Sequence, residues 1–441
     1  MESMSATMLL SDLAPELIFS IFACCDISSV VSVGQTCRYL HTLAFDKSVW
    51  LGLLNNLRRK LILDHCTHDL EALSTDEMIG AVRRLLTGPQ TWSPQNLDSY
   101  SAPQVTKRIT LHPFGTGPGV LEWGHRAKLL PSGRYVLLNN SGTLECWNLG
   151  DDRVVWRYTT TIEHAEVYQF AAEERDIEST IMIVICVRAY PRNARRLYYV
   201  EIVSVDIQNG TRNCLLTARA PESEDHFLSE PVISGNFAAV IIDSGQTQHM
   251  IINWAAQSYF IVDGHPDTPS RIAFIPQHFI LMNRSLDEKD QIHLISNDAL
   301  STYWVPITTR DDAKFSPIFA ENIPKRSTFE DSHAEQTFAD MHVHESPLRE
   351  GDYRLWIHGS NRAAKGGLFS CTLSIPSNGE PQWFQRSRDG GYTVFSAAFS
   401  APPKPARVKM PLFRGDYFGL AAYSGVLTYS TRSSIVLQYY K

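Results

Sequence analysis

The residues most suited to bind a metal ion are two histidines, His342 and His344, which are separated by a single residue. Side chains at positions i and i+2 of a β-strand point to the same side, so both imidazoles could reach one ion. No third ligand is evident near them. The eight cysteines are scattered and form no CxxC pair, which indicates neither a zinc cluster nor a disulfide framework. We therefore predict no metal site and no cofactor.

Catalytic chemistry has little support in the sequence. The glycine-rich run 115–119 could suggest a phosphate-binding loop, but no Lys-Ser or Lys-Thr pair follows it and no helix is expected after it. The chain has no G-x-S-x-G nucleophile elbow, and no arrangement of its serines, histidines and acidic residues indicates a catalytic triad. We expect no catalytic residue and no enzymatic activity. The enzymatic alternative is a hydrolase with paired carboxylates on a β-domain, for which no compact acidic cluster stands out.

Four arginines form the densest basic cluster of the later part of the chain. If they projected together they could receive a phosphorylated peptide, because guanidinium groups match phosphate oxygens. A solvated loop over 189–196 explains the same residues without any function. The arginines are Arg188, Arg192, Arg195 and Arg196.

Composition limits the possible partners and surroundings. The 441 residues are 44% hydrophobic and 20% charged, as in soluble globular proteins, and a net charge of -7 gives no basic field for nucleic acid. The longest apolar run, 181–187, has the length of a buried strand and is too short to span a bilayer. The N-terminus lacks the basic region of a secretory signal. We expect no nucleic-acid or membrane partner, reduced cysteines, and a location in the cytoplasm or the nucleus.

The chain changes character near residue 90, from helical spacing of apolar residues to short alternating runs. We predict a helical domain over 8–60, a helical extension over 61–90, a Pro/Gly-rich linker over 91–120 and a β-domain over 121–441. Within the linker, an edge strand is expected near 105–111. The fold class is therefore α+β with separate domains, a small all-α module before a large all-β domain.

Repeated β-units fill the second part of the chain. The clearest reads as strand, turn and strand over 134–149, followed by a strand at 154–158, and a similar unit closes the chain over 417–440. Five or six such units recur at intervals of roughly 40 to 75 residues, which favours an irregular, WD-repeat-like β-propeller. A pair of β-sandwiches is the alternative.

The helical part begins with a distinctive helix. Pro15 suits the first turn, and Leu17, Ile18, Ile21 and Phe22 follow at i, i+1, i+4 and i+5. Asp26 can cap a second helix, Cys37 to Leu43 predicts a third, and 49–63 a fourth. In the last helix of this part, Ser74 and Glu77 form a capping box ahead of an apolar stripe.

The stretch Leu13-Ala14-Pro15-Glu16-Leu17-Ile18-Phe19-Ser20-Ile21-Phe22 resembles the opening L-P-x-E-L-L-x-x-I-L of F-box domains. Asp26-Ile27, Val30, Val33, the run Gln35-Thr36-Cys37-Arg38-Tyr39-Leu40 and the closing Trp50 follow in the order of that family, particularly of its fungal members. Ala14 stands where the family usually has its first proline, next to Pro15. The resemblance covers about residues 10–60.

This resemblance implies docking to a Skp-type adaptor and, through it, to a cullin and a ubiquitin-conjugating enzyme. The β-domain would then recruit an unknown protein substrate through residues that the sequence does not identify. The chain would be the substrate-recognition subunit of a ubiquitin ligase, or alternatively a scaffold that binds the adaptor without delivering a substrate. The predicted adaptor contacts are Leu13, Pro15, Glu16, Leu17, Ile18, Ile21, Phe22, Ile27, Val30, Cys37, Arg38 and Leu40.

Elementary geometry supports a docking role for the first helix. Residues i and i+1 diverge by about 100° on a helix, so Leu17, Ile18, Ile21 and Phe22 cannot all face one small core. Some of this apolar surface should be covered by another chain, and some of the predicted contacts must instead fill the core of the module. The alternative is that residues 10–60 are a helical cap packed on the β-domain, with no apolar surface left for a partner.

Overall fold

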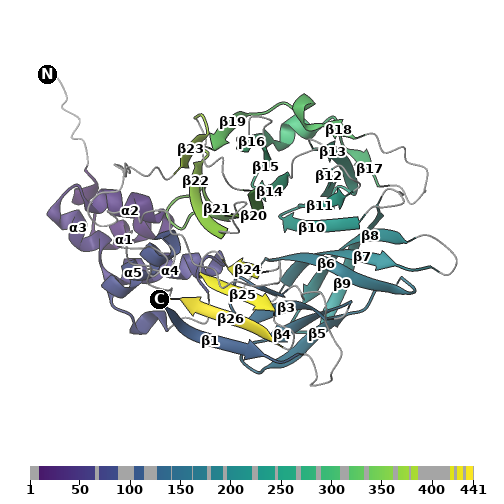
Figure 1. The fold of residues 1–441 in the computed structure, drawn as a ribbon. Helices are drawn as coiled ribbons and strands as arrows, with labels where there is room; N and C mark the ends of the chain where they lie inside the picture. The colour runs from purple at the N-terminus through teal and green to yellow at the C-terminus, as the bar shows by residue number, and fades with distance from the viewer. Residues whose placement is uncertain are drawn as a thin grey trace.

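The structure of the protein is a computed structural model in which a helical module precedes a large β-domain (Figure 1). The described residues are 9–64, 69–87, 104–113, 127–140, 142–160, 162–175, 180–191, 196–220, 227–243, 247–264, 270–284, 290–307, 317–331, 337–360, 366–376, 379–385, 418–421, 425–430 and 434–440.

The helical module, residues 10–87, contains five α-helices and two short 3₁₀ helices. The longest of these helices have 13 residues, and no described helix has the length and apolar character needed to cross a membrane. The elements are η1 (Leu10–Asp12), α1 (Pro15–Cys24), α2 (Ile27–Gly34), α3 (Arg38–Ala44), α4 (Lys47–Arg59), η2 (Leu70–Ala72) and α5 (Thr75–Thr87).

The helices begin where the predicted caps stand. Asp26 accepts a hydrogen bond from the backbone N–H of Ser29 at the start of α2. At the start of α5, Glu77 accepts hydrogen bonds from the backbone N–H and the hydroxyl of Ser74, while Ser74 accepts one from the backbone N–H of Glu77. These bonds satisfy donors that a helix leaves unpaired in its first turn. The capping box that the sequence predicts is therefore present.

The described strands form six sheets. Each of the first two sheets is made of four strands that are consecutive in the chain. Some of the later sheets include strands that are not consecutive. The sheets are β2 (Ala127–Leu129), β3 (Tyr135–Asn140), β4 (Thr143–Asn148) and β5 (Arg153–Tyr158); β6 (Ala165–Glu174), β7 (Thr180–Ala189), β8 (Leu197–Asp206) and β9 (Thr211–Arg219); β10 (Phe227–Ser234), β11 (Phe237–Asp243), β12 (Thr247–Asn253) and β13 (Ser258–Asp263), extended by β17 (Val305–Pro306) and β18 (Ile318–Phe319); β14 (Arg271–Ile275), β15 (His278–Arg284), β16 (Asp290–Ser296) and β19 (Ser327–Asp331); β20 (Thr337–Glu345), β21 (Asp352–Ser360), β22 (Gly366–Ser374) and β23 (Gln382–Gln385); and β24 (Phe418–Ala421), β25 (Val426–Ser430), β26 (Ile435–Tyr440) and β1 (Val105–Leu111).

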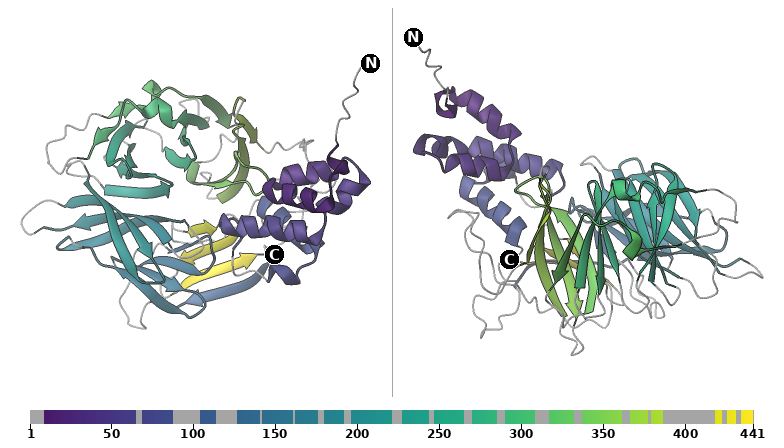
Figure 2. Two further views of the ribbon diagram at one scale, coloured as in Figure 1. Left: turned by 180° about the vertical axis from the view of Figure 1, so that it is seen from behind. Right: turned by 90° about the horizontal axis from the view of Figure 1, so that it is seen from above.

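These sheets are the blades of a six-bladed β-propeller (Figures 1 and 2). The first strands of neighbouring blades lie together, as β6 does with β10, β10 with β14, β14 with β20, and β24 with β2. Two short helices, η4 (Asn297–Leu300) and η5 (Ala320–Asn322), lie between β16 and β19. The predicted propeller is confirmed, and the sandwich alternative is wrong.

Strand β7 shows why the sequence of a central blade strand reads as one continuous apolar run. Alternate side chains of a strand point to opposite faces of the sheet, and both faces of this blade are covered by a neighbouring blade. Ile181, Ile183 and Ile185 lie in the apolar core shared with β2–β5. Met182 and Val184 lie in the core shared with β10–β13. The propeller core is therefore a series of layers between blades.

The predicted edge strand at 105–111 is present, but its place corrects the predicted linker over 91–120. Strand β1 pairs antiparallel with the C-terminal strand β26, from Val105 opposite Tyr440 to Leu111 opposite Ile435. Residues from the N-terminal side of the propeller thus form the outer strand of its last blade. The β-domain accordingly includes residues before 121.

The helical extension packs as part of the helical module. Met78, Val82 and Leu85 of α5 are buried in the same core as Trp50 and Leu54 of α4. The indole Nε1 of Trp50 donates to the carbonyl of Ala44, 3.1 Å away, so this large buried side chain has its polar atom satisfied. One propeller residue, Leu348, belongs to this core as well.

Buried histidines make the propeller sensitive to acid. Burial, together with the nearby charge of Arg271, lowers the pKa of His249 to about 3. Burial and the charge of Lys325 lower the pKa of His293 to about 4. The hydroxyls of Ser270 and Thr328 hydrogen-bond these rings. An unfolded chain would bind protons at both histidines near pH 6.5, whereas the folded chain resists protonation until much lower pH.

We predict that the free energy of unfolding falls as the pH is lowered from about 6.5 to about 4.5. In this range the unfolded state binds more protons than the folded state, and each such histidine contributes a slope of up to about 1.4 kcal/mol per pH unit. Urea denaturation at several pH values in this range should show that the free energy of unfolding depends less steeply on pH for His249→Gln than for the wild type. The matched control, His112→Gln, replaces an exposed histidine beside β1 and should keep the wild-type dependence of the free energy of unfolding on pH. If the free energy of unfolding of His249→Gln depended on pH as steeply as that of the wild type, this account would be contradicted.

Candidate protein-docking surface

Helix α1 divides its apolar residues between the core and the surface. Ile18 and Phe22 are fully buried, whereas Leu17 is 54% exposed and Ile21 is 39% exposed. Because successive residues are rotated by about 100° on a helix, the two pairs must point in different directions. Leu17 and Ile21 are one turn apart and share a face. The helix therefore presents two large aliphatic side chains to solvent.

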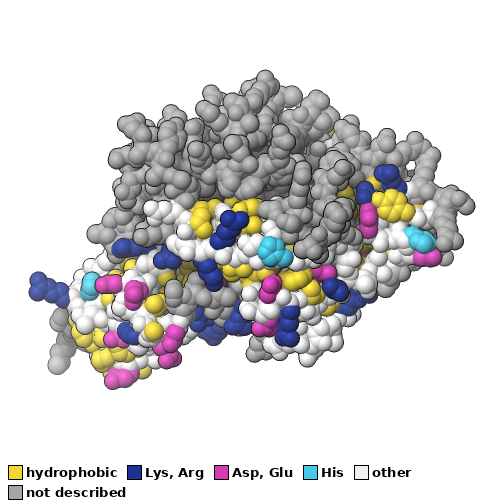
Figure 3. All heavy atoms as spheres, turned by 60° about the horizontal axis from the view of Figure 1, so that its bottom comes forward, with side chains coloured by type: hydrophobic (Ala, Val, Ile, Leu, Met, Phe, Trp, Pro, Cys, Tyr) yellow, Lys and Arg dark blue, Asp and Glu magenta, His cyan; other side chains and the backbone are white. Residues whose placement is uncertain are grey.

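Helix α3 adds an aromatic side chain to this part of the molecule. Tyr39 is 42% exposed, and α3 packs against α1. Figure 3 shows hydrophobic side chains at the surface of the helical end, at its left, among acidic and basic ones. We call Leu17, Ile21 and Tyr39 the apolar surface. Large exposed apolar groups on a small module are typical of a site that another protein covers.

The structure separates the predicted adaptor contacts into two sets. Those in the core cannot reach a partner directly and instead support the surface from beneath. The core set is Ile18, Phe22, Ile27, Val30 and Leu40, while Pro15, Glu16, Leu17, Ile21, Cys37 and Arg38 are exposed and Leu13 is half-buried.

Close packing fixes α2 against α3, the helix that carries Tyr39. A Cβ atom on Gly34, the last residue of α2, would lie 2.8 Å from the Cβ of Ala44, so only glycine permits this approach. At the start of α3, the Cys37 sulfur accepts the backbone N–H of Leu40 at 3.5 Å. At the start of α4, hydrogen bonds from Ser48 lower the pKa of the Asp46 carboxyl. The apolar surface is thus carried by a well-defined scaffold.

Sequence reasoning did not single out Tyr39 as a contact, nor the exposed Leu9 (60%) ahead of η1. Tyr39 lies between two residues that were predicted, and its exposure follows from its position on α3. The exposure of Leu9 had no comparable signal, because it precedes the regular helical spacing.

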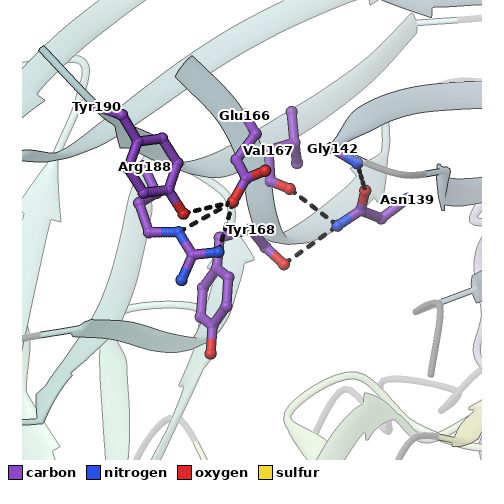
Figure 4. A network of polar contacts seen from close by, with 7 residues as sticks. All are labelled: Asn139, Gly142, Glu166, Val167, Tyr168, Arg188 and Tyr190. Carbon is purple, nitrogen blue, oxygen red and sulfur yellow. Dashed lines mark hydrogen bonds and ion pairs between the residues drawn. The ribbon is translucent and has the colours of Figure 1, made fainter. Parts of the chain in front are cut away.

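The arginine cluster of the propeller is only partly within the described residues, which include Arg188 and Arg196 but not Arg192 or Arg195. Arg188 donates two hydrogen bonds to Glu166, and Tyr190 donates one to the same carboxylate oxygen (Figure 4). The Arg188 guanidinium also lies over the rings of Tyr168 and Tyr190, at 4.9 and 5.3 Å. The charge of Arg188 is therefore neutralised within the chain.

Nearby backbone contacts give this network a structural role. The Asn139 amide donates to the carbonyls of Val167 and Tyr168 and accepts the N–H of Gly142 (Figure 4). Gly142 has a φ of +84°, and a Cβ there would lie 2.8 Å from the Cβ of Glu166. These bonds join the first two blades at the turn that the sequence predicts.

The histidine pair lies on β20, as its spacing predicts. Burial lowers the pKa of His344 well below its usual value, and the neighbouring His342, Lys128 and Arg354 lower it further. A neutral imidazole among cationic neighbours is a poor setting for a divalent ion. Within the described ranges, no group of three or more His, Cys, Asp or Glu side chains could hold a metal. The glycine-rich run 115–119 lies outside the described residues.

Several solved structures are distantly similar to this chain. The Drosophila Semaphorin 1a extracellular domains 1–2 are 8% identical over 77% of this chain and 88% of theirs, with a TM-score of 0.35. The WD40 domain of SCAP from fission yeast is 10% identical over 73% of this chain and 85% of that one, with a TM-score of 0.24. Porphyromonas gingivalis dipeptidyl peptidase 4 is 9% identical over 62% of this chain and 40% of that one, with a TM-score of 0.30.

The family comparison concerns the helical module. No curated protein sequence is significantly similar to the chain. The family model for F-box-like domains matches residues 10–54, the segment from η1 into α4 that carries the apolar surface. The protein therefore carries a segment that matches the F-box-like family, residues 10–54, ahead of a six-bladed β-propeller.

Proposed function

We propose that this protein is the substrate-recognition subunit of a Skp–cullin–F-box type ubiquitin ligase. The single observation that carries the proposal is the apolar surface that the F-box-like domain leaves uncovered, Leu17 and Ile21 above all. A Skp-type adaptor would cover this surface and link the chain to a cullin. The propeller would hold a protein substrate, and the chain would act in the cytoplasm or the nucleus.

In this role the chain needs no active site. A ubiquitin-conjugating enzyme carried by the cullin would supply the chemistry, and the propeller would supply proximity. Holding a substrate lysine near the charged conjugating enzyme converts a bimolecular encounter into an effectively intramolecular step. The rate would then depend on how long and in which orientation the substrate is held.

The exposed face of α1 should dominate adaptor binding. Complete burial of an exposed leucine or isoleucine side chain contributes about 1.5–3 kcal/mol. Leu17 and Ile21 are 54% and 39% exposed, so covering what remains of both would contribute about 1.5–3 kcal/mol in total. We predict that Leu17→Asp with Ile21→Asp weakens binding to a recombinant Skp-type adaptor by more than about 100-fold. Isothermal titration calorimetry with the full chain would measure this loss. Because both side chains are exposed, the thermal unfolding temperature should change little.

The matched control places two aspartates one turn apart on another helix. Asn55 and Arg59 are exposed on α4, outside the apolar surface, and Asn55→Asp with Arg59→Asp should bind the adaptor like the wild type. Wild-type affinity of the α1 double variant would refute adaptor docking through α1. A similar loss in both double variants would show that added charge, rather than the apolar surface, determines binding.

A second experiment distinguishes the ligase from an adaptor-bound scaffold. Affinity capture of the wild type from proteasome-inhibited cells should recover the adaptor, a cullin and ubiquitin-modified proteins, and the α1 double variant should lose all three. Recovery of the adaptor without a cullin would favour the scaffold. Point variants suit this test better than deletion of residues 1–60, because deletion would expose α5 and Leu348, which share the core of the helical module.

A further inference from the structure

The turn between β20 and β21, residues 346–351, contacts the helical module. Leu348 of this turn is 6% exposed and lies in the same core as the helices of the F-box-like domain. Its backbone carbonyl accepts the N–H of Ser28 at 3.1 Å, in the first turn of α2. This N–H is one of the donors that a helix cannot satisfy internally. The propeller thus completes the start of α2.

A second propeller residue completes the end of another helix. Arg354 of β21 is 7% exposed, and its guanidinium donates to the carbonyl of Leu85 at 2.6 Å, in the last turn of α5. Carbonyls at a helix C-terminus are unpaired and carry partial negative charge, which favours a cation. The guanidinium also lies 3.9 Å from the centre of the Trp356 ring.

Other links restrict the remaining freedom of the two parts. Lys60, just after α4, lies 3.7 Å from Glu345 at the end of β20. Both side chains are substantially exposed, so this ion pair contributes little to stability but adds a third point of contact. The chain itself passes from α5 to β1, which belongs to a different blade from β20 and β21. Contacts at three separate helices oppose rotation about any single axis.

We infer that Leu348 and Arg354 are positioning residues, which hold the adaptor-docking surface at one fixed orientation to the propeller. This inference rests on the proposed function for its consequence, since a fixed orientation would confine ubiquitin transfer to lysines within a limited zone. The fixed orientation itself is a property of the chain and can be measured whether or not the adaptor binds.

Distances between paired spin labels test the inference directly. Labels would be placed on Asn55→Cys in α4 and Gln208→Cys in the turn after β8, in a full chain whose other exposed cysteines are replaced by serine. The wild type should give one narrow distance distribution, both alone and with the adaptor bound. Leu348→Ala and Arg354→Met should each broaden the distribution at least twofold, because each removes one anchor and leaves the apolar surface intact. The matched control, Arg153→Met, removes an exposed arginine of the first blade and should leave the width unchanged.

Adaptor binding separates this inference from the proposed function. Arg354→Met should keep wild-type adaptor affinity while its distance distribution broadens. In a reconstituted ubiquitination reaction, the chain's own lysines would serve as the probe. Mass spectrometry should find modification on few lysines in the wild type and on more of them in Arg354→Met. If Arg354→Met kept the narrow distance distribution of the wild type, the inference would be overturned even if adaptor binding is unchanged. If Leu348→Ala fails to fold, the distance distribution of Arg354→Met alone tests the inference.

Discussion

The helical module depends on an apolar core that two parts of the chain build together. Helices α1 to α5 supply most of its residues, and Leu348 of the propeller supplies the last. A module of this size has barely enough buried surface to fold alone. One more large buried side chain and two capped helix ends therefore contribute substantially to its stability. The blade β20–β23 completes the core of the helical module, the start of α2 and the end of α5. The F-box-like domain is therefore not structurally independent of the propeller.

Much of the helical module could be predicted because its signals are local. The caps at Asp26 and Ser74 and the spacing of Leu17, Ile18, Ile21 and Phe22 each lie within one or two turns of helix. The rotation of 100° per residue even predicted that this set must divide. The rotation could not predict which of these residues face the core, because the direction of the core depends on where α3 and α4 pack. Only the structure assigns Ile18 and Phe22 to the interior.

The remaining features depend on contacts between residues far apart in sequence. Strand β1 lies in a proline-rich stretch, and nothing near it reveals that its partner is the C-terminal strand. Strands β17 and β18 have only two residues each, too few to show alternation, yet both extend the sheet of β13. Leu348 and Arg354 look like ordinary residues of a turn and a strand. Their importance comes from helix ends that lie more than 250 residues earlier, as with Leu85 and Arg354, which are 269 residues apart.

Pairing of β1 with β26 also bears on how the protein is made. The hydroxyl of Thr106 donates to the carbonyl of Tyr439, 333 residues later in the chain. While the blades between β1 and β26 are being translated, the edge of β1 therefore has no β26 to pair with. Unpaired strand edges favour aggregation, so this interval is the one in which the growing chain most needs a chaperone. A chain truncated before β26 would leave that edge open permanently.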